Sequence, residues 1–175
     1  LSSYTNLLLM PSSEEAENFA ESVLFFNPRQ PVYLLEPFDA SPYSGLYTNP
    51  RTLASRVRWL WLLSQENPEG GVFVSSIEAF QQATVPPDRL LKHARKLEKG
   101  FDLPLEITRW LNFLGYVPAP RVEDVGQYSL RGGILDVFSP AHDFPVRIEL
   151  FGDTVESLRH FNPENQRTLD LLDNA

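Results

Sequence analysis

The stretch from Gly126 to Thr168 constrains the fold more than any other part of the chain, because glycine and proline divide it into short alternating segments. Gly152-Asp153 separates two such segments, and a glycine that supplies the positive φ of a type II′ turn is typical of a β-hairpin. Gly132-Gly133 and the segment 139–145 mark the other breaks. The pattern therefore predicts three or four short antiparallel strands in sequence order.

The third of these strands, 146–151, places a large aromatic side chain among charged ones. Side chains alternate between the two faces of a strand, which gives one apolar face made of Val146, Ile148 and Leu150. The opposite face is made of Arg147, Glu149 and Phe151. Arginine beside an exposed aromatic is typical of a docking surface. An alternative stays open, in which a neighbouring helix covers Phe151 while Arg147 and Glu149 form a solvated pair.

Composition narrows the class of protein. The net charge is −8, and residues 1–88 carry four basic and ten acidic side chains, against eleven and thirteen in residues 89–175. An acidic first half argues against DNA as its direct partner. The absence of cysteine excludes disulfides and fits an intracellular protein. No apolar run approaches the ~18 residues of a membrane span, so no membrane partner is expected.

Residues 1–88 alternate predicted strands and helices. Short apolar runs predict strands at 7–10, 31–35 and 72–74. Ser12, with Glu15 three residues later, predicts the start of the first helix, and the second begins at Asn49-Pro50. A short third helix is predicted at 76–82. In the second helix the spacing predicts an inward face made of Leu53, Val57, Leu60, Trp61 and Leu63. This order predicts an open parallel sheet.

Pro86-Pro87 predicts a domain boundary, because neither a strand nor a helix continues through it. The following residues, 89–100, fit a helix or an edge strand; their basic side chains are interpreted as a charged edge that keeps the protein monomeric. A clearer helix is predicted from Asp102, ended by Gly115 in a left-handed conformation. The predicted fold class is α/β: a parallel-sheet domain followed by a small α+β domain with an antiparallel meander.

Patterns for catalysis or for nucleotide and metal binding are missing. The segment after the first strand, 11–13, has no glycine-rich phosphate loop, and no lysine precedes Lys92. We therefore expect no catalytic residue, cofactor or metal site in this chain. The histidines lack metal-ligand spacing and are expected on loops or the surface; they are His93, His142 and His160. Asp136 and Glu149 could form an acid–base pair, although carboxylates on such strands are more often salt-bridged.

Four segments of the second half stand in one run: 131–138 (RGGILDVF), 145–153 (PVRIELFGD), 155–159 (VESLR) and 161–168 (FNPENQRT). The first three resemble a signature shared by the bacterial excision-repair helicase UvrB and the UvrB-like N-terminal module of the transcription-repair coupling factor, Mfd. The fourth is similar to the Mfd version. The resemblance is dense over 115–169 and weaker over 1–88. With its start at Leu1, the chain is expected to be a piece of a longer protein.

The resemblance implies a degenerate RecA-like domain at 1–88, a UvrA-binding domain at 89–170 and the start of a return segment to the first domain at 171–175. It also implies a strand at 89–100, and we adopt that prediction over the helix. In the second domain it implies that UvrA binds through Arg131, Arg147 and Phe151, with Glu149 as a further candidate.

The function implied is a non-catalytic module that recruits UvrA to RNA polymerase stalled at DNA damage, in the bacterial cytoplasm. ATP, Mg²⁺, RNA polymerase and DNA would be bound by other parts of a parent translocase. One alternative is a fragment of UvrB itself, ATP-dependent and in contact with DNA, although the lack of UvrB's long tyrosine-rich hairpin favours Mfd. Another is a structural insert with no partner.

Overall fold

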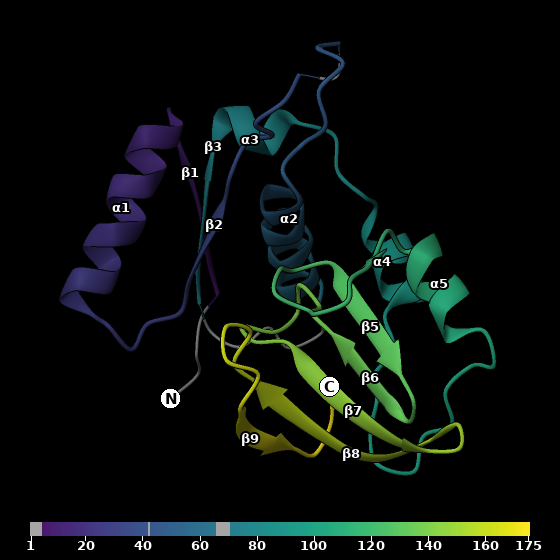
Figure 1. Cartoon of the computed structure of the whole chain (residues 1–175). Helices are drawn as coiled ribbons and strands as arrows, with labels where there is room; N and C mark the ends of the chain where they lie inside the picture. Colours follow the sequence, from purple (N-terminus) through teal and green to yellow (C-terminus); the bar gives the residue numbers. More distant parts are fainter. Residues whose placement is uncertain (1–4, 42, 66–70) are drawn as a thin grey trace. The chain divides into compact units, whose positions relative to one another are not determined.

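The structure is a computed structural model that describes residues 5–41, 43–65 and 71–175. The chain divides into two compact units, Leu1–Lys92 and His93–Ala175. The division falls at the end of the helix α4 (Pro87–His93), downstream of the proline pair. Figure 1 follows the elements along the chain. Within the described residues, no helix has the length and apolar character needed to cross a membrane.

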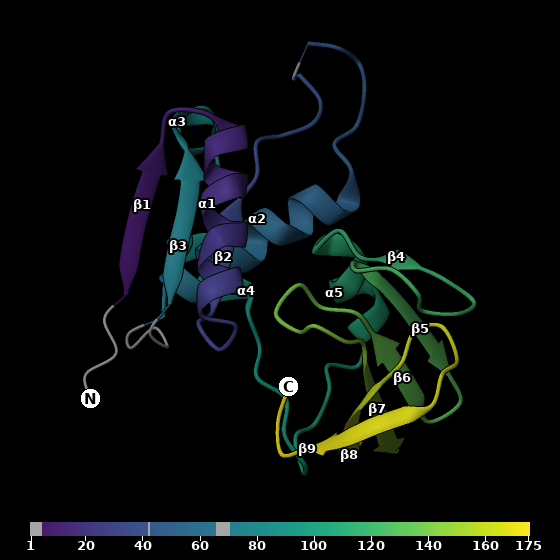
Figure 2. The same ribbon diagram turned by 90° about the vertical axis from the view of Figure 1, so that its left-hand side faces the viewer.

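The first unit is built on a parallel sheet of three strands, β1 (Asn6–Met10), β2 (Val32–Leu35) and β3 (Val72–Ser76). The strand order is β1-β3-β2, so β3 lies in the middle, as Figure 2 shows. The helices α1 (Ser13–Phe26) and α2 (Pro50–Leu63) lie on opposite sides of this sheet (Figure 1), and α3 (Ile77–Gln81) follows β3 directly. The predicted parallel sheet is confirmed.

Local signals set both helix starts in this unit. The Ser12 hydroxyl accepts a hydrogen bond from the Glu15 amide at 3.2 Å, and the Asn49 side chain accepts one from the Arg51 amide at 2.9 Å. The inward face predicted for α2 is wrong in detail. Arg56 and Trp59 are its buried residues, while Leu53 is exposed. The burial of Arg56 is compensated in part by hydrogen bonds from its guanidinium to the backbone carbonyls of Glu36 and Ala79.

The second unit contains a mixed sheet of six strands in the order β4-β5-β6-β7-β8-β9. The strands are β4 (Val117–Pro118), β5 (Gln127–Arg131), β6 (Ile134–Val137), β7 (Val146–Phe151), β8 (Thr154–Phe161) and β9 (Thr168–Leu172). Only β4 and β5 run parallel; the other neighbours are antiparallel. The predicted meander is confirmed, and the sheet extends by one strand on either side of it.

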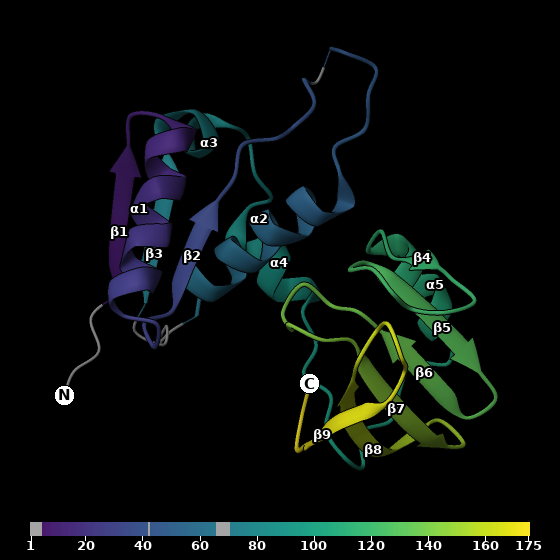
Figure 3. The ribbon, with the colours of Figure 1, turned by 60° about the vertical axis from the view of Figure 1, so that its left-hand side comes forward.

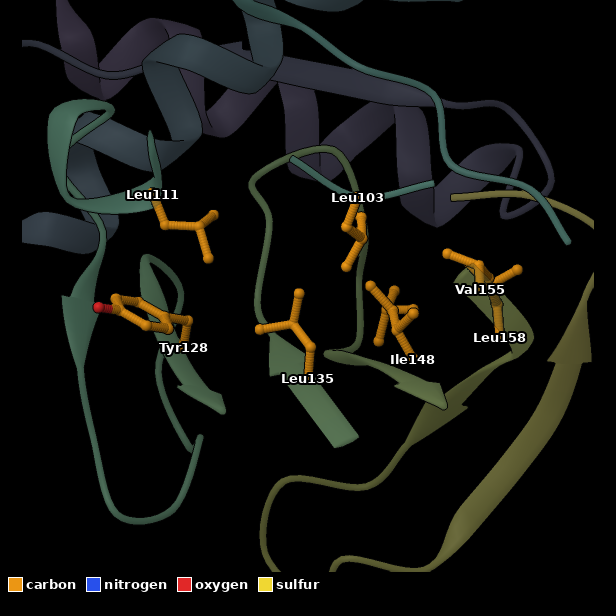
Figure 4. Packing of buried hydrophobic residues seen from close by; sticks show 8 residues of the cluster. Leu103, Leu111, Tyr128, Leu135, Ile148, Val155 and Leu158 are labelled. Carbon is orange, nitrogen blue, oxygen red and sulfur yellow. The ribbon is translucent and has the colours of Figure 1, made fainter. Parts of the chain in front are cut away.

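One face of this sheet forms the core of the second unit. Leu135, Ile148 and Leu158 are buried there from three neighbouring strands, and Leu111 comes from the helix α5 (Ile107–Phe113), as Figure 4 shows. Figure 3 shows α5 beside β4 and β5. Two-residue turns connect β5 to β6 and β7 to β8. Gly152 (φ +64°) adopts the predicted positive φ, and Gly132 (φ +58°) does the same in the other turn.

Two segment predictions need correction. Residues 89–93 are helical in α4 and not a strand, because Pro87 and Asp88 favour a helix start; extended pairing begins only near Leu97, which exchanges backbone hydrogen bonds with Ala175. The helix predicted from Asp102 begins at Ile107. Residues 171–175 complete β9 and this pairing; their expected return to the first domain stays a prediction.

Candidate protein-binding face

The face of the six-stranded sheet opposite the core carries the predicted site residues. Directly paired residues of neighbouring antiparallel strands point to the same side. One such row runs through Ser129, Asp136, Arg147 and Arg159, and the next through Arg131, Ile134, Glu149 and Ser157. Alternation along β7 adds Phe151 to this side. We call this surface the charged face.

Arg147 is held firmly within the charged face. Its Nε and Nη2 donate to the two carboxylate oxygens of Asp136 at 2.7 and 2.8 Å, and Nη2 also donates to Gln166 Oε1 at 3.1 Å. The guanidinium lies over the Phe161 ring, 4.5 Å from its centroid. The hydrogen bonds to Asp136 raise the pKa of Arg147 above its ordinary value. The side chain is only 17% exposed, and Asp136 only 1%.

Arg131, at the end of β5, is the accessible arginine of the face. Its Nη2 lies 3.7 Å from Asp136 Oδ2, beyond hydrogen-bonding distance, and its side chain is 62% exposed. Asp136 therefore lies between two cations, with strong bonds to one and a weaker Coulombic contact to the other. Arg131 can therefore bind a carboxylate of another protein, whereas most of the Arg147 guanidinium is already occupied.

A second ion pair balances the charge on the neighbouring strand. Arg147 and Arg159 are directly opposite on β7 and β8, an arrangement in which like charges repel. Glu149 accepts hydrogen bonds from Arg159 Nη2 at 2.6 Å and from the Ser157 hydroxyl at 2.7 Å. The hydrogen bond from Arg159 is the main reason that the pKa of Glu149 is lowered. Each arginine thus has its own carboxylate.

Phe151 is the exposed apolar residue at the end of β7. Its side chain is 80% exposed, so no described part of the chain covers it. The alternative in which a helix covers Phe151 is wrong, and so is the pairing of Arg147 with Glu149, because each bonds to a different strand. The possible acid–base pair of Asp136 and Glu149 is also wrong, since both carboxylates bind arginines.

A β-bulge and a close backbone contact shape this end of the face. Glu149 pairs with Ser157 but Leu150 pairs with Val155, so Glu156 is an extra residue in β8. Such a bulge increases the local twist. Gly133 lies against this region: its carbonyl accepts from the Leu150 amide at 2.7 Å, and a Cβ on Gly133 would meet the Leu150 carbonyl oxygen at 2.8 Å. Glycine is therefore required at this position.

The sequence analysis named Arg131, Arg147 and Phe151 as candidate contact residues but missed the residues that hold them in place. Asp136 was visible only as a lone carboxylate, because its pairing with Arg147 depends on the register of two strands. Gln166 lies in the FNPENQRT segment, where its spacing gave no sign of a contact 19 residues away. The expected surface position of His160 is wrong. It lies within β8, where its ring contacts His142 at 3.1 Å and the Asp170 carboxylate at 3.1 Å.

The described side chains contain no group of three or more histidine, cysteine, aspartate or glutamate residues placed to hold a metal ion. Arginines paired with carboxylates and an exposed phenylalanine supply hydrogen bonds, charge and apolar surface. These are the components of a protein-binding surface.

Comparison with known proteins gives consistent matches. Residues 96–175 match the model of the UvrB interaction domain. The transcription-repair-coupling factor of Myxococcus xanthus is 37% identical over 166 residues, 91% of this chain and 14% of that protein. The factor of Staphylococcus epidermidis is 32% identical over 167 residues and that of Escherichia coli K12 28% over 165, each covering 94% of this chain and 14% of the relative. The chain thus spans 14% of the length of these curated relatives.

Proposed function

Because the second unit belongs to the UvrB interaction domain family and nearly the whole chain is related to transcription-repair-coupling factors, we propose that this chain is a non-catalytic module that recruits UvrA during transcription-coupled repair. The observation that carries the proposal is Phe151, which is 80% exposed at the edge of a face that also carries the predicted contact residues Arg131 and Arg147.

In this proposal the four candidate residues have different roles at the interface. Phe151 and Arg131 contact UvrA directly, since both side chains are exposed. Arg147 offers UvrA the edge of its guanidinium that Asp136 and Gln166 do not occupy, and its hydrogen bonds to Asp136 keep both side chains in place. Glu149 accepts hydrogen bonds from Arg159 and Ser157, and its negative charge balances that of Arg159. Contacts with RNA polymerase and DNA, and binding of ATP and Mg²⁺, belong in this proposal to other parts of a longer protein.

The test is the affinity of the chain for purified UvrA, measured by titration calorimetry with the variants Phe151→Ala and Arg131→Ala. Exposed aromatic and arginine anchors at interfaces contribute on the order of 1–3 kcal/mol each, so both variants should bind about five- to 150-fold more weakly. Phe113→Ala is the matched control, because Phe113 is an exposed aromatic on α5, which packs on the core side of the same sheet. If the unmodified chain shows no binding to UvrA, the proposal is wrong.

A fragment of the UvrB helicase is the alternative function, and no feature of the described residues favours it. The three relatives described above are named as coupling factors. Duplex DNA binding with a steep dependence on salt concentration would favour the helicase instead.

A further inference from the structure

Several side-chain hydrogen bonds hold the loop between β8 and β9 in one conformation, yet its residues are not among the predicted contacts. Asn162 closes it: its side-chain oxygen accepts from the Glu164 and Asn165 amides at 2.9 and 3.1 Å, and its carbonyl accepts from the Gln166 amide at 2.7 Å. Gln166 has a φ of +64° and is the only residue other than glycine with a positive φ in the described ranges. This conformation is unfavourable for a residue with a side chain.

The Gln166 side chain makes contacts that a glycine at this φ would lose. Its Nε2 donates to the carbonyls of Pro163 at 2.8 Å and Val122 at 3.3 Å, which fixes the orientation of the carboxamide. Its Oε1 then accepts from Arg147 Nη2 at 3.1 Å. The strained backbone therefore brings one acceptor oxygen to the arginine.

Four contacts together leave the guanidinium of Arg147 little freedom. Asp136 holds Nε and Nη2, Gln166 holds Nη2 from a second direction, and the Phe161 ring lies beneath Cζ. Nη1 is the guanidinium nitrogen for which the described residues provide no hydrogen-bond acceptor. An arginine that is already ordered loses less entropy when it binds a partner.

We propose that Gln166 is a positioning residue for partner binding: together with Asp136 it fixes Arg147 so that Nη1 faces an acceptor oxygen of the bound protein. The inference rests on the proposed function. It assigns the FNPENQRT loop a role at the binding face, although Gln166 itself need not touch the partner.

Two substitutions separate the acceptor from the loop shape. Gln166→Gly suits the positive φ and keeps the Asn162 hydrogen bonds that close the loop. It removes the oxygen that faces Arg147 together with the Nε2 contacts to Pro163 and Val122. Gln166→Glu loses the Nε2 donor to Pro163 and Val122 but keeps an oxygen that can accept a charge-assisted hydrogen bond from Arg147. Affinity for UvrA should fall about three- to tenfold in Gln166→Gly, the loss expected for one hydrogen bond, and should stay within about threefold of the unmodified chain in Gln166→Glu. Thermal unfolding of both variants would be recorded alongside.

Nuclear magnetic resonance of the free 20.0 kDa chain provides a readout that loop shape alone would not move. Rotation about the Nε–Cζ bond of Arg147 should be slow in the unmodified chain and in Gln166→Glu, and faster in Gln166→Gly. Unchanged rotation in Gln166→Gly would overturn the inference. So would an unchanged affinity of Gln166→Gly in an assay where Phe151→Ala binds weakly.

The two proposals fail in different ways. If the unmodified chain does not bind UvrA, the proposed function is wrong and the positioning role falls with it, even where the rotation of Arg147 changes as expected. If the unmodified chain binds and only the Gln166 variants behave otherwise than expected, the positioning role alone is wrong.

Discussion

The two units each place an arginine over a phenylalanine ring, and they hold it in different ways. In the first unit, Arg56 is 2% exposed and lies 4.1 Å from the centroid of Phe38; it donates to the backbone carbonyls of Glu36 and Ala79. In the second unit, Arg147 lies over Phe161 but donates to the Asp136 carboxylate and Gln166.

The difference appears in the pKa of each guanidinium. Loss of solvent lowers the pKa of Arg56, because carbonyl dipoles compensate a buried cation only in part. The Asp136 carboxylate raises the pKa of Arg147. Arg56 therefore serves to connect α2 to the segments around Glu36 and Ala79, whereas Arg147 remains part of a surface.

The largest expected effect is that of Arg56→Ala. The substitution leaves two carbonyls without their donor and opens a cavity, so we expect a loss on the order of 4 kcal/mol in the free energy of unfolding of the first unit. Urea unfolding followed by tryptophan fluorescence measures it, because Trp59 lies on the same helix. Arg29→Ala, at an exposed position, is the control. A loss below about 1 kcal/mol would mean that the contacts of Arg56 contribute little to the stability of the first unit.

Arg147→Ala should have the next largest effect on the free energy of unfolding. A residue on the face opposite the core would be expected to matter little for stability. Here the substitution leaves Asp136 buried without its main partner, which costs about 3 kcal/mol. Arg131→Ala is the matched control and should cost under about 1 kcal/mol, because its contact is exposed. Equal losses in the two variants would contradict the different burial of these arginines.

The smallest expected effect concerns pH. The pKa of Glu149 is lowered below its ordinary value of 4.5 in the folded chain, so its contribution to stability is present above pH 4.5 and is lost as the pH falls through the folded pKa. Glu149→Gln should therefore flatten the decline of the melting temperature below pH 4.5. Carbonyl oxygens do not titrate in this range, so the contacts of Arg56 should not contribute to that decline. Glu156→Gln, an exposed neighbour in β8, should leave the profile unchanged.

Local patterns predicted much of each unit. The glycine-containing turns, the helix start at Ser12 and the alternation in β7 depend on interactions within a few residues, and the structure confirms them. A helix was also visible locally, in the spacing of apolar residues within 89–100, but the family resemblance led to the wrong choice of a strand. Local chemistry was the better guide at that segment.

The sequence by itself determined which residues lie on the two faces of β7, because alternation is a property of the strand. Only the tertiary structure decided what those residues do. The registers of β6 with β7 and of β7 with β8 place Asp136 opposite Arg147 and give Glu149 to Arg159, and the β8–β9 loop brings Gln166 to the same guanidinium. These contacts join residues 10 to 19 positions apart. Their geometry depends on the register of the whole sheet, so a pattern of neighbouring residues in the sequence does not predict it.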